Sequence, residues 1–359
     1  MHMADALLSP AVGATFWAGT LGTIAFCSKK LKENLDEKMI PLMGVLGAFI
    51  FAAQMINFTI PGTGASGHLG GGMILAIILG PYAAFIVMAS VLTVQALFFA
   101  DGGLLALGCN IWNLGIYPCF IAYPLIYKPL TKGTAGPTRI VLASIISGVI
   151  ALQVGAISVV IETMLSGRSE LPFSTFVLLM QPVHLTIGLV EGSVTAGVIN
   201  FVKAARPEIL DSVSSTRPLS AEISIRKVFT GVLVVALLTG GMLSWFASAN
   251  PDGLEWSIEK IFGKPELPEQ KRGIAPVWKK IQEKTAFLPD YGFKKPEGAP
   301  EGSEGGKGEP SWPAIEPGTS LSGFLGSALV LGLIFLLGFA IRVVRKNKTA
   351  EKMTGHDIR

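Results

Sequence analysis

The sequence predicts an all-α polytopic membrane bundle of about seven spans, followed by a two-span C-terminal module. Hydrophobic residues make up 50% of the 359 residues and charged residues only 15%. Soluble domains carry roughly 25% charged residues, so this chain lacks the polar surface that a water-soluble globule needs. The mean hydropathy is +0.55. The apolar residues fall into long runs, and basic residues gather beside these runs, which indicates membrane topology and argues against nucleic-acid binding.

Nine apolar segments are candidate membrane helices. Eight have about the length that a membrane-spanning helix needs, roughly 20 residues. A ninth segment, 70–79, follows a glycine-rich loop and ends before Pro81; we count it as a short span. The eight longer segments are 11–26, 40–56, 81–99, 104–127, 140–165, 173–202, 229–247 and 321–344.

Loop charge predicts the orientation of these spans, because short cytoplasmic loops are enriched in Lys and Arg. The opposing short loops, 57–69, 100–103 and 166–171, hold one basic residue, Arg168. With nine spans, the basic clusters fall on one side only if the N-terminus is outside and the C-terminus inside. These clusters are Lys29, Lys30, Lys32 and Lys38; Lys128, Lys132 and Arg139; Lys203, Arg206, Arg217, Arg226 and Lys227; and Arg342, Arg345, Lys346 and Lys348.

Composition divides the chain into two membrane modules. The first covers 1–205, and a polar stretch, 206–226, is predicted to be a cytoplasmic linker. The second covers 227–348, and its two spans flank a long outside segment. Within that segment, 296–313 is rich in Gly, Pro, Glu and Lys and is not expected to fold alone, whereas the part with Trp256 and Trp278 is expected to be partly ordered. Residues 349–359 form a polar cytoplasmic tail.

The N-terminus carries the most informative pair of residues, Met1 and His2. No basic stretch of a secretory signal precedes the first span, so cleavage is not expected, and the large His2 disfavours removal of the initiator methionine. The Met1 amine, the His2 amide nitrogen and His2 Nδ1 form a planar chelate, a geometry that suits Ni²⁺ and Cu²⁺. His68, predicted on the same outer side, supplies a fourth nitrogen. The alternative is that His2 is incidental on a frayed terminus.

Other polar residues are candidates for supporting roles. Gln54, Asn57 and Ser66 lie near His68 in the sequence and are expected to orient it. Polar groups within or at the ends of the spans are costly in lipid and are expected to face the bundle interior, either as hydrogen-bond partners between helices or as functional groups. These polar groups are Gln95, Asp101, Asn110, Glu162, His184 and Glu191.

Two nucleotide motifs bear on function. Residues 62–67 match GxGxxG, but that pattern requires a strand–turn–helix context, and here it lies in an outside loop between spans. No GxxxxGK[ST] sequence occurs, so ATP hydrolysis by that route is not expected of this chain.

Several sequence blocks resemble a known family. They are Met1-His2 with Leu7-Leu8-Ser9-Pro10, the stretches 52–58 and 66–69, and QALFFADGG at 95–103. Over about 1–205 these blocks resemble the M-type substrate-specific component of energy-coupling-factor transporters for nickel and cobalt. PDGLE at 251–255 and PDYGF at 289–293 resemble the small two-span N component, here fused to M.

The resemblance implies a seven-span M part with the N-terminal tail in the metal pocket and with Met1, His2 and His68 as ligands. It also implies a non-catalytic subunit in the plasma membrane, which depends on a transmembrane coupling (T or Q) component and on cytoplasmic ATP-binding cassette ATPases. Nickel is the expected substrate, since amide-nitrogen chelation favours it. Cobalt uptake for cobalamin synthesis is the alternative, and copper would also suit the geometry.

Other function classes remain as rivals. A proton-coupled secondary metal transporter would use Glu162, His184 and Glu191 as proton carriers. A membrane enzyme with the metal as Lewis acid is disfavoured, because four nitrogen ligands in a plane leave no good position for a substrate. For a metal sensor, the cytoplasmic tail is too short to carry an output domain.

Overall fold

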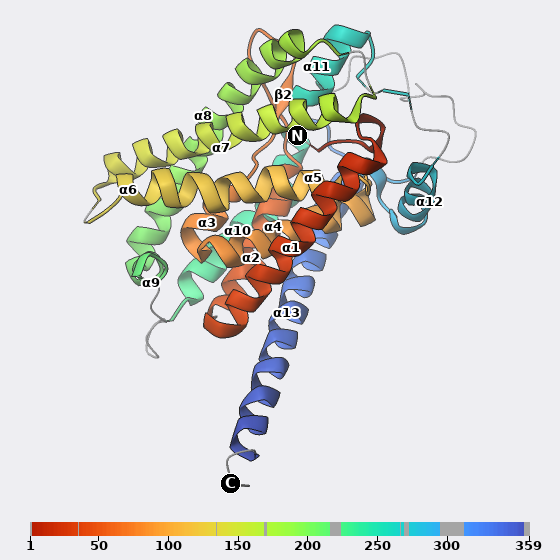
Figure 1. Ribbon diagram of the computed structural model, residues 1–359. Coiled ribbons are helices and arrows are strands. Elements are labelled where there is room, and N and C mark those ends of the chain that lie inside the picture. Colours follow the sequence, from red (N-terminus) through yellow and green to blue (C-terminus); the bar gives the residue numbers. More distant parts are fainter. Residues whose placement is uncertain are drawn as a thin grey trace.

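Helices make up most of the chain, as the apolar runs predict (Figure 1). The computed structural model describes residues 2–34, 36–133, 135–168, 171–215, 224–265, 267–268, 273–294 and 312–354. Between α2 and α3 lies a short antiparallel hairpin, β1 (Phe58–Thr59) with β2 (Ser66–Gly67). The helices of the first module are α1 (Pro10–Asn34), α2 (Met39–Gln54), α3 (Gly72–Leu79), α4 (Pro81–Phe99), α5 (Leu107–Ile111), α6 (Lys128–Leu130), α7 (Pro137–Ser166) and α8 (Phe173–Ala205), and a π-helical stretch, Trp112–Tyr127, joins α5 to α6.

Beyond the first module, the chain continues as α9 (Pro207–Ser215), α10 (Arg226–Gly241), α11 (Gly253–Phe262), α12 (Ala275–Thr285) and α13 (Pro317–Thr354). The stretch expected to be a polar linker, 206–226, contains the helix α9, in which the side chain of Ile209 is completely buried. Residues 216–223 and most of the Gly- and Pro-rich stretch 296–313 lie outside the described residues. Among the described residues of the outside segment are α11, α12 and one turn at Pro289–Tyr291.

Five described helices, α1, α4, α7, α8 and α13, are long and apolar enough to cross a membrane, and α2 is a shorter apolar helix. The segment expected at 70–79 is the eight-residue helix α3, which is buried along its whole length. Eight residues of α-helix rise only about 12 Å, well short of a hydrocarbon core about 30 Å thick. α3 continues into α4 through Gly80, whose φ of 78° lies in the left-handed region.

The helices pack around a centre formed by α2 and α4, most of whose residues are buried. Helices α7 and α8 approach each other backbone to backbone at small residues, as membrane helices often do. At Gly192 an added Cβ would lie 2.3 Å from the Cα of Ile145. Large apolar side chains are exposed on the outward faces, for example Leu165, Leu178 and Phe339, which suits a surface covered by lipid.

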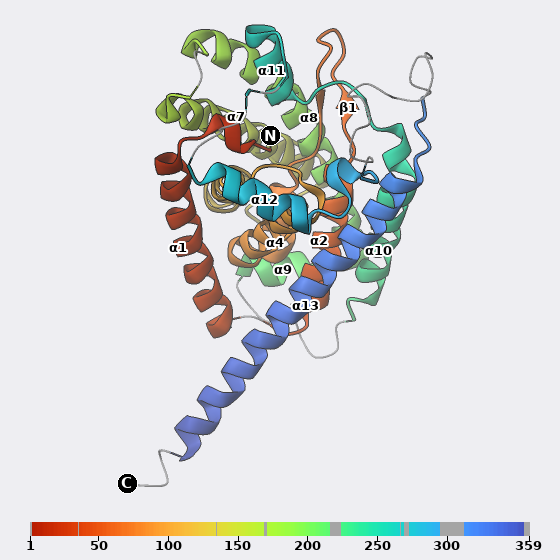
Figure 2. The ribbon, with the colours of Figure 1, turned by 90° about the vertical axis from the view of Figure 1, so that its right-hand side faces the viewer.

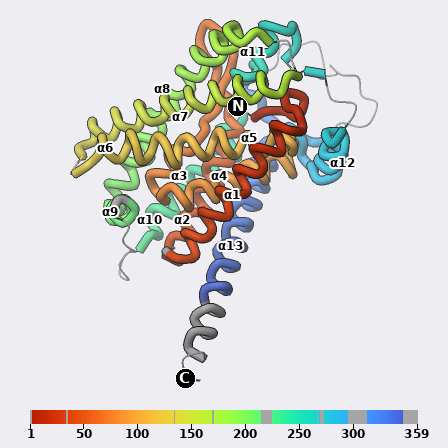
Figure 3. The backbone as a smooth tube through the Cα atoms, viewed as in Figure 1, coloured from red at the N-terminus to blue at the C-terminus, as the bar shows by residue number. Residues whose placement is uncertain are grey.

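The second module packs directly on the first (Figure 2). Helices α10 and α13 lie against α2, and the Ser327 hydroxyl of α13 donates to Ala48 O at 3.2 Å. Helix α12 lies beside α4, where Gln282 Nε2 donates to Ala96 O at 2.8 Å and to Gly102 O at 2.7 Å. In Figure 3 the N-terminal segment lies in the upper part of the molecule, whereas α13 extends beyond the other helices at the lower end. Through α12, the second module contacts the loop after α4, beside the N-terminal segment and the candidate site.

Candidate metal centre

The N-terminal segment is fixed inside the bundle. Met3 is fully buried. Its backbone N–H donates to Asn110 Oδ1 at 2.8 Å, while Asn110 Nδ2 donates to Met3 O at 3.3 Å. Gly103 N–H donates to the same carbonyl at 3.0 Å. One side-chain amide thus satisfies both polar groups of Met3, and the segment is held in place instead of fraying.

Two glycines in the loop after α4 make room for this segment. Gly102 has a φ of 80°, and an added Cβ there would lie 2.9 Å from Asn110 Nδ2 and 3.4 Å from His2 Cβ. At Gly103 an added Cβ would lie 1.9 Å from Asp5 Oδ1. That carboxylate in turn accepts a hydrogen bond from Ala106 N–H at 3.0 Å. Burial raises the pKa of Asp5 above its ordinary value.

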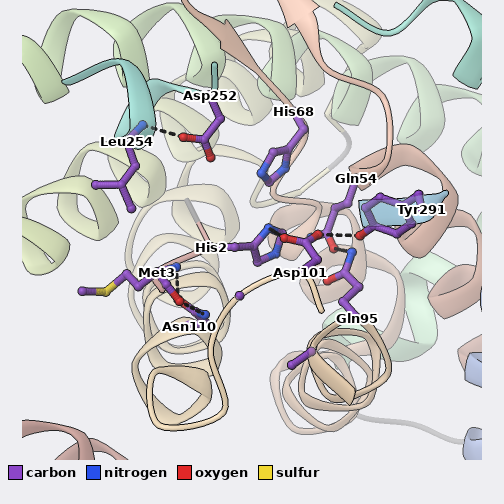
Figure 4. A network of polar contacts seen from close by, with 12 residues as sticks. His2, Met3, Gln54, His68, Gln95, Asp101, Asn110, Asp252, Leu254 and Tyr291 are labelled. Carbon is purple, nitrogen blue, oxygen red and sulfur yellow. Dashed lines mark hydrogen bonds and ion pairs between the residues drawn. The ribbon is translucent and has the colours of Figure 1, made fainter. Parts of the chain in front are cut away.

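His2 and His68 come together at the end of this segment. Their rings are parallel within 7°, with centroids 5.0 Å apart, and Figure 4 shows His68 directly beside His2. His68 is 8% exposed. Met1, the third predicted ligand, lies outside the described residues. The structure therefore places together the two predicted imidazole ligands.

The His2 ring pairs with a carboxylate from the loop after α4. His2 Nδ1 lies 3.0 Å from Asp101 Oδ1, and the other Asp101 oxygen accepts a hydrogen bond from the Tyr291 hydroxyl. Burial raises the pKa of Asp101, but the neighbouring His2 and Tyr291 outweigh burial and hold the pKa at about 2. The second ring nitrogen, His2 Nε2, is buried without a hydrogen-bond partner among the described residues. A buried ring nitrogen of this kind is available for another contact.

His68 is held as a neutral imidazole. Its Nδ1 lies 3.0 Å from Leu69 O, and because a carbonyl oxygen only accepts, Nδ1 carries the hydrogen and Nε2 the lone pair. Burial lowers the pKa of His68 to about 3, and the neighbouring His2 acts in the same direction. Metal ions bind neutral imidazole, so His68 is in the metal-binding form over the physiological range.

The three residues expected to orient His68 contact backbone groups in this part of the structure. Gln54 Nε2 donates to Gly70 O at 2.8 Å, and Gln95 Nε2 donates to Gln54 Oε1 at 2.9 Å. Ser66 ties its loop to the second module, since its hydroxyl donates to Asn250 O at 2.7 Å. The backbone carbonyl of Asn57 accepts from Ser248 N–H at 2.6 Å.

The remaining predicted polar candidates have separate partners. Glu162 accepts from Asn113 Nδ2 at 3.0 Å and from the Ser158 hydroxyl at 2.8 Å. His184 places Nδ1 2.8 Å from Met180 O. Glu191 accepts from the backbone N–H groups at positions 70 and 71, next to His68. Of these residues, Glu191 makes a contact that bears on the His2–His68 pair.

Two residues of the second module were not predicted as site residues, Tyr291 and Asp252. Their only signal in the sequence is their place in the PDYGF and PDGLE stretches. Asp252 begins α11 as its N-cap and accepts from the N–H groups of Leu254 and Glu255 at 2.8 and 2.9 Å. Figure 4 shows its carboxylate on the same side of His2 as His68.

A cavity of about 270 Å³ lies over His2 and Asp101 and is lined by both modules. Its lining is acidic, with one basic residue, Lys279. The carboxylates that line it are Asp5, Asp101, Asp252, Glu255 and Asp290. Negative charge in a cleft raises the local concentration of cations, so the cavity suits the approach of a metal ion.

No group of three or more His, Cys, Asp or Glu side chains within the described ranges is arranged to hold a metal ion. A metal centre at His2 and His68 therefore needs donors of another kind. Backbone and terminal nitrogens are such donors, and they favour planar coordination of Ni²⁺ or Cu²⁺.

Comparisons with known proteins find similar metal transport proteins. Residues 2–209 match the family CbiM, described as the cobalt uptake substrate-specific transmembrane region, and residues 226–343 match the PDGLE domain. The chain is 30% identical to a putative fused nickel transport protein, NikMN, of Archaeoglobus fulgidus, over 94% of this chain and 98% of that protein. It is 29% identical to the cobalt transport protein CbiM of Sorangium cellulosum, over 60% of this chain and 97% of that protein.

A solved structure is also similar. It is the crystal structure of a truncated transition metal transporter, with 32% sequence identity and a TM-score of 0.51. The match covers 57% of this chain and 99% of that one.

Proposed function

Because the chain belongs to the CbiM family of nickel and cobalt transport proteins and carries a PDGLE domain, we propose that it is the substrate-capturing subunit of an ATP-driven nickel uptake system. It is a multi-pass protein of the plasma membrane, with an M component fused to an N component. The observation that carries the proposal is the parallel pairing of His2 and His68 at the end of a fixed N-terminal segment.

In this proposal Met1 and His2 chelate the ion through the terminal amine, the His2 amide nitrogen and His2 Nδ1. His68 closes the plane with Nε2, the nitrogen that carries the lone pair in the tautomer set by its bond to Leu69. The docking of Met3 on Asn110 supports the chelate, because a fixed tail loses less conformational entropy when it binds the ion.

Chelation by Nδ1 requires a change at His2, since this nitrogen lies against Asp101. A half-turn of the ring about its Cβ–Cγ bond exchanges the two ring edges. Cδ2 then takes the place of Nδ1 beside Asp101, and Nε2–H lies next to it on the same edge of the ring. With a small further shift of the ring, Asp101 would accept this N–H, the arrangement that commonly orients metal-bound histidines.

The proposal includes a topology and a domain division. Counted as nine membrane segments, with the short, buried α3 as a partial span inside the bundle, the chain has its N-terminus outside and its C-terminus inside, with the basic clusters in the cytoplasm. Residues 1–205 form the M-type metal-binding domain, 206–226 a cytoplasmic linker, 227–348 the N-type module and 349–359 a tail. The opposite positions of the N-terminal segment and the end of α13 support this orientation (Figure 3).

Energy comes from other chains in this proposal. A transmembrane coupling component and cytoplasmic ATP-binding cassette ATPases drive release of the ion to the inside, and this chain itself catalyses no reaction. The absence of a GxxxxGK[ST] sequence supports the division. Uptake of ⁶³Ni²⁺ by cells that express the full system, but not by cells that carry this chain alone, tests it. Equal nickel uptake without any ATPase would contradict the coupled scheme.

Nickel is favoured over cobalt by the planar nitrogen donors and by the fused M–N organisation shared with the protein named as a nickel transporter. Competition between Ni²⁺ and Co²⁺ for the purified protein, followed by calorimetry, tests this choice. Tighter binding of Co²⁺ would overturn it.

The proposed ligands are tested by single substitutions. We expect His2→Ala and His68→Ala to weaken nickel binding, and His356→Ala in the C-terminal tail to leave it unchanged as a matched control. Nickel affinity that is the same in all three variants would place the ion elsewhere.

A further inference from the structure

A buried carboxylate, Glu191 of α8, contacts the loop that carries His68. Glu191 is 2% exposed. One of its oxygens accepts from Gly70 N–H at 2.7 Å, and the other accepts from Gly71 N–H at 3.1 Å. A carboxylate inside a membrane bundle is costly and marks a functional position by default. Its two partners place that position next to the proposed metal ligand.

The peptide group between Leu69 and Gly70 connects Glu191 with His68. The N–H of this group donates to Glu191, and its carbonyl oxygen lies 3.0 Å from His68 Nδ1. Because that carbonyl takes the hydrogen of Nδ1, the lone pair of His68 is on Nε2. Hydrogen bonds in such a chain polarise one another, so the carboxylate strengthens the bond that orients the ring.

The same face of α8 also holds the loop on the other side of His68. At Gly67 an added Cβ would lie 2.5 Å from Cδ1 and from Cγ1 of Ile187. Ile187 and Glu191 are four residues apart, and therefore lie on one face of the helix. From α2, Gln54 fixes the carbonyl of Gly70 at 2.8 Å. His68 therefore projects from a loop whose backbone is clamped before and after it.

We propose that Glu191 is a positioning residue for His68: by holding the Leu69–Gly70 peptide group on α8, it sets the tautomer and the direction of the imidazole that completes the metal plane. This inference rests on the proposed metal site. Ligating histidines usually donate their other N–H to a carboxylate or a carbonyl. Here the carboxylate acts one step further away, through the carbonyl of a peptide group.

The simpler role of Glu191 is to fix the turn before α3, which begins at Gly72. The buried N–H groups of Gly70 and Gly71 need acceptors, and Glu191 supplies them whether or not a metal binds. The two roles differ in one respect. Loss of a purely structural contact lowers the stability of the fold, whereas loss of a positioning contact weakens metal binding, and does so only through His68.

Glu162 of α7 is the matched control, because it is also a fully buried carboxylate with two hydrogen-bond donors. Its donors are Asn113 and Ser158, neither of which belongs to the His68 loop. Glu162→Gln therefore removes a comparable membrane carboxylate and leaves the loop intact.

The test is a double-substitution cycle on the full-length, native-start protein, with Ni²⁺ affinity measured by calorimetry and the metal's visible absorption recorded in parallel. We expect Glu191→Gln to weaken nickel binding by roughly 10- to 100-fold, the loss of a hydrogen bond to a charged group, and to shift the absorption band. Glu162→Gln should stay within about threefold of the unchanged protein. In a His68→Ala background, Glu191→Gln should have no further effect.

Three results would overturn the inference: unchanged affinity in Glu191→Gln, an equal loss in Glu162→Gln, or a further loss when Glu191→Gln is added to His68→Ala. If His68→Ala itself binds nickel as tightly as the unchanged protein, the proposed metal site is wrong. Weak binding in His68→Ala together with unchanged binding in Glu191→Gln refutes the positioning role alone.

Glu191→Asp guards against a variant that does not fold. It keeps the buried carboxylate, but its side chain is one methylene shorter and does not reach both N–H groups. We expect nickel binding to weaken by about tenfold, since one hydrogen bond to a charged group is lost. Affinity equal to that of the unchanged protein would overturn the proposal.

Discussion

Replacement of Asn110 by alanine tests whether the fixed N-terminal segment matters for metal capture. Asn110 is 1% exposed, and its amide makes both hydrogen bonds to Met3, at 2.8 and 3.3 Å. Its removal takes away two bonds worth about 1 kcal/mol each and leaves the Met3 N–H buried without that acceptor. The free energy that holds the segment in the bundle should therefore fall by about 2–3 kcal/mol. Only Gly103 continues to donate to the Met3 carbonyl.

Because the proposed chelate requires the docked segment, this loss should appear as a weaker nickel affinity, by roughly 30- to 150-fold. Calorimetric titration of Ni²⁺ into the purified Asn110→Ala protein measures it. Asn113→Ala is the matched control, since Asn113 is equally buried but donates to Glu162 instead of the N-terminal segment. If the two variants bind nickel with affinities within about threefold of each other, docking of Met3 does not contribute to capture.

Two further substitutions test the surroundings of His2. Tyr291→Phe removes the hydroxyl that donates to Asp101, and we expect nickel to bind about tenfold more weakly. Tyr117→Phe, which removes a hydroxyl bonded to Ser158, should have no effect, and an equal loss in both would contradict a specific role for Tyr291. Gly103→Ala should abolish tight nickel binding, because its Cβ would lie 1.9 Å from a carboxylate oxygen of the N-terminal segment. Gly136→Ala, where a Cβ meets nothing within 4 Å, should bind normally; full binding by Gly103→Ala would show that the segment docks differently.

Much of the fold follows from the sequence, because the length and apolar composition of membrane helices can be recognised in it. The apolar runs predicted both ends of α4, α7 and α8 within three residues, whereas α1 and α13 extend eight and ten residues beyond the predicted C-terminal ends. The length of the helix within 70–79 does not follow from its composition. Its composition is as apolar as that of a span, but its length is set by the glycines at both ends, and α3 is only eight residues long.

The pairing of His2 with His68 could be anticipated from chemistry, since few nitrogen ligands lie on the predicted outer side. The contacts that hold the pair could not. Tyr291 reaches Asp101 from 190 positions away, and Glu191 reaches Gly70 from 121 positions away. Such pairs depend on how whole helices pack, which no local pattern in one sequence encodes.

The terminal amine of Met1 is the donor on which the account depends most. The direct test is to titrate Ni²⁺ into the native-start protein and into a version with one residue added before Met1, and to follow visible absorption and heat. We predict tight binding with the absorption band of square-planar nickel in the native-start protein, and the loss of both in the extended version. Equal binding with the same band in the two proteins would contradict the chelate and move the metal site away from Met1 and His2.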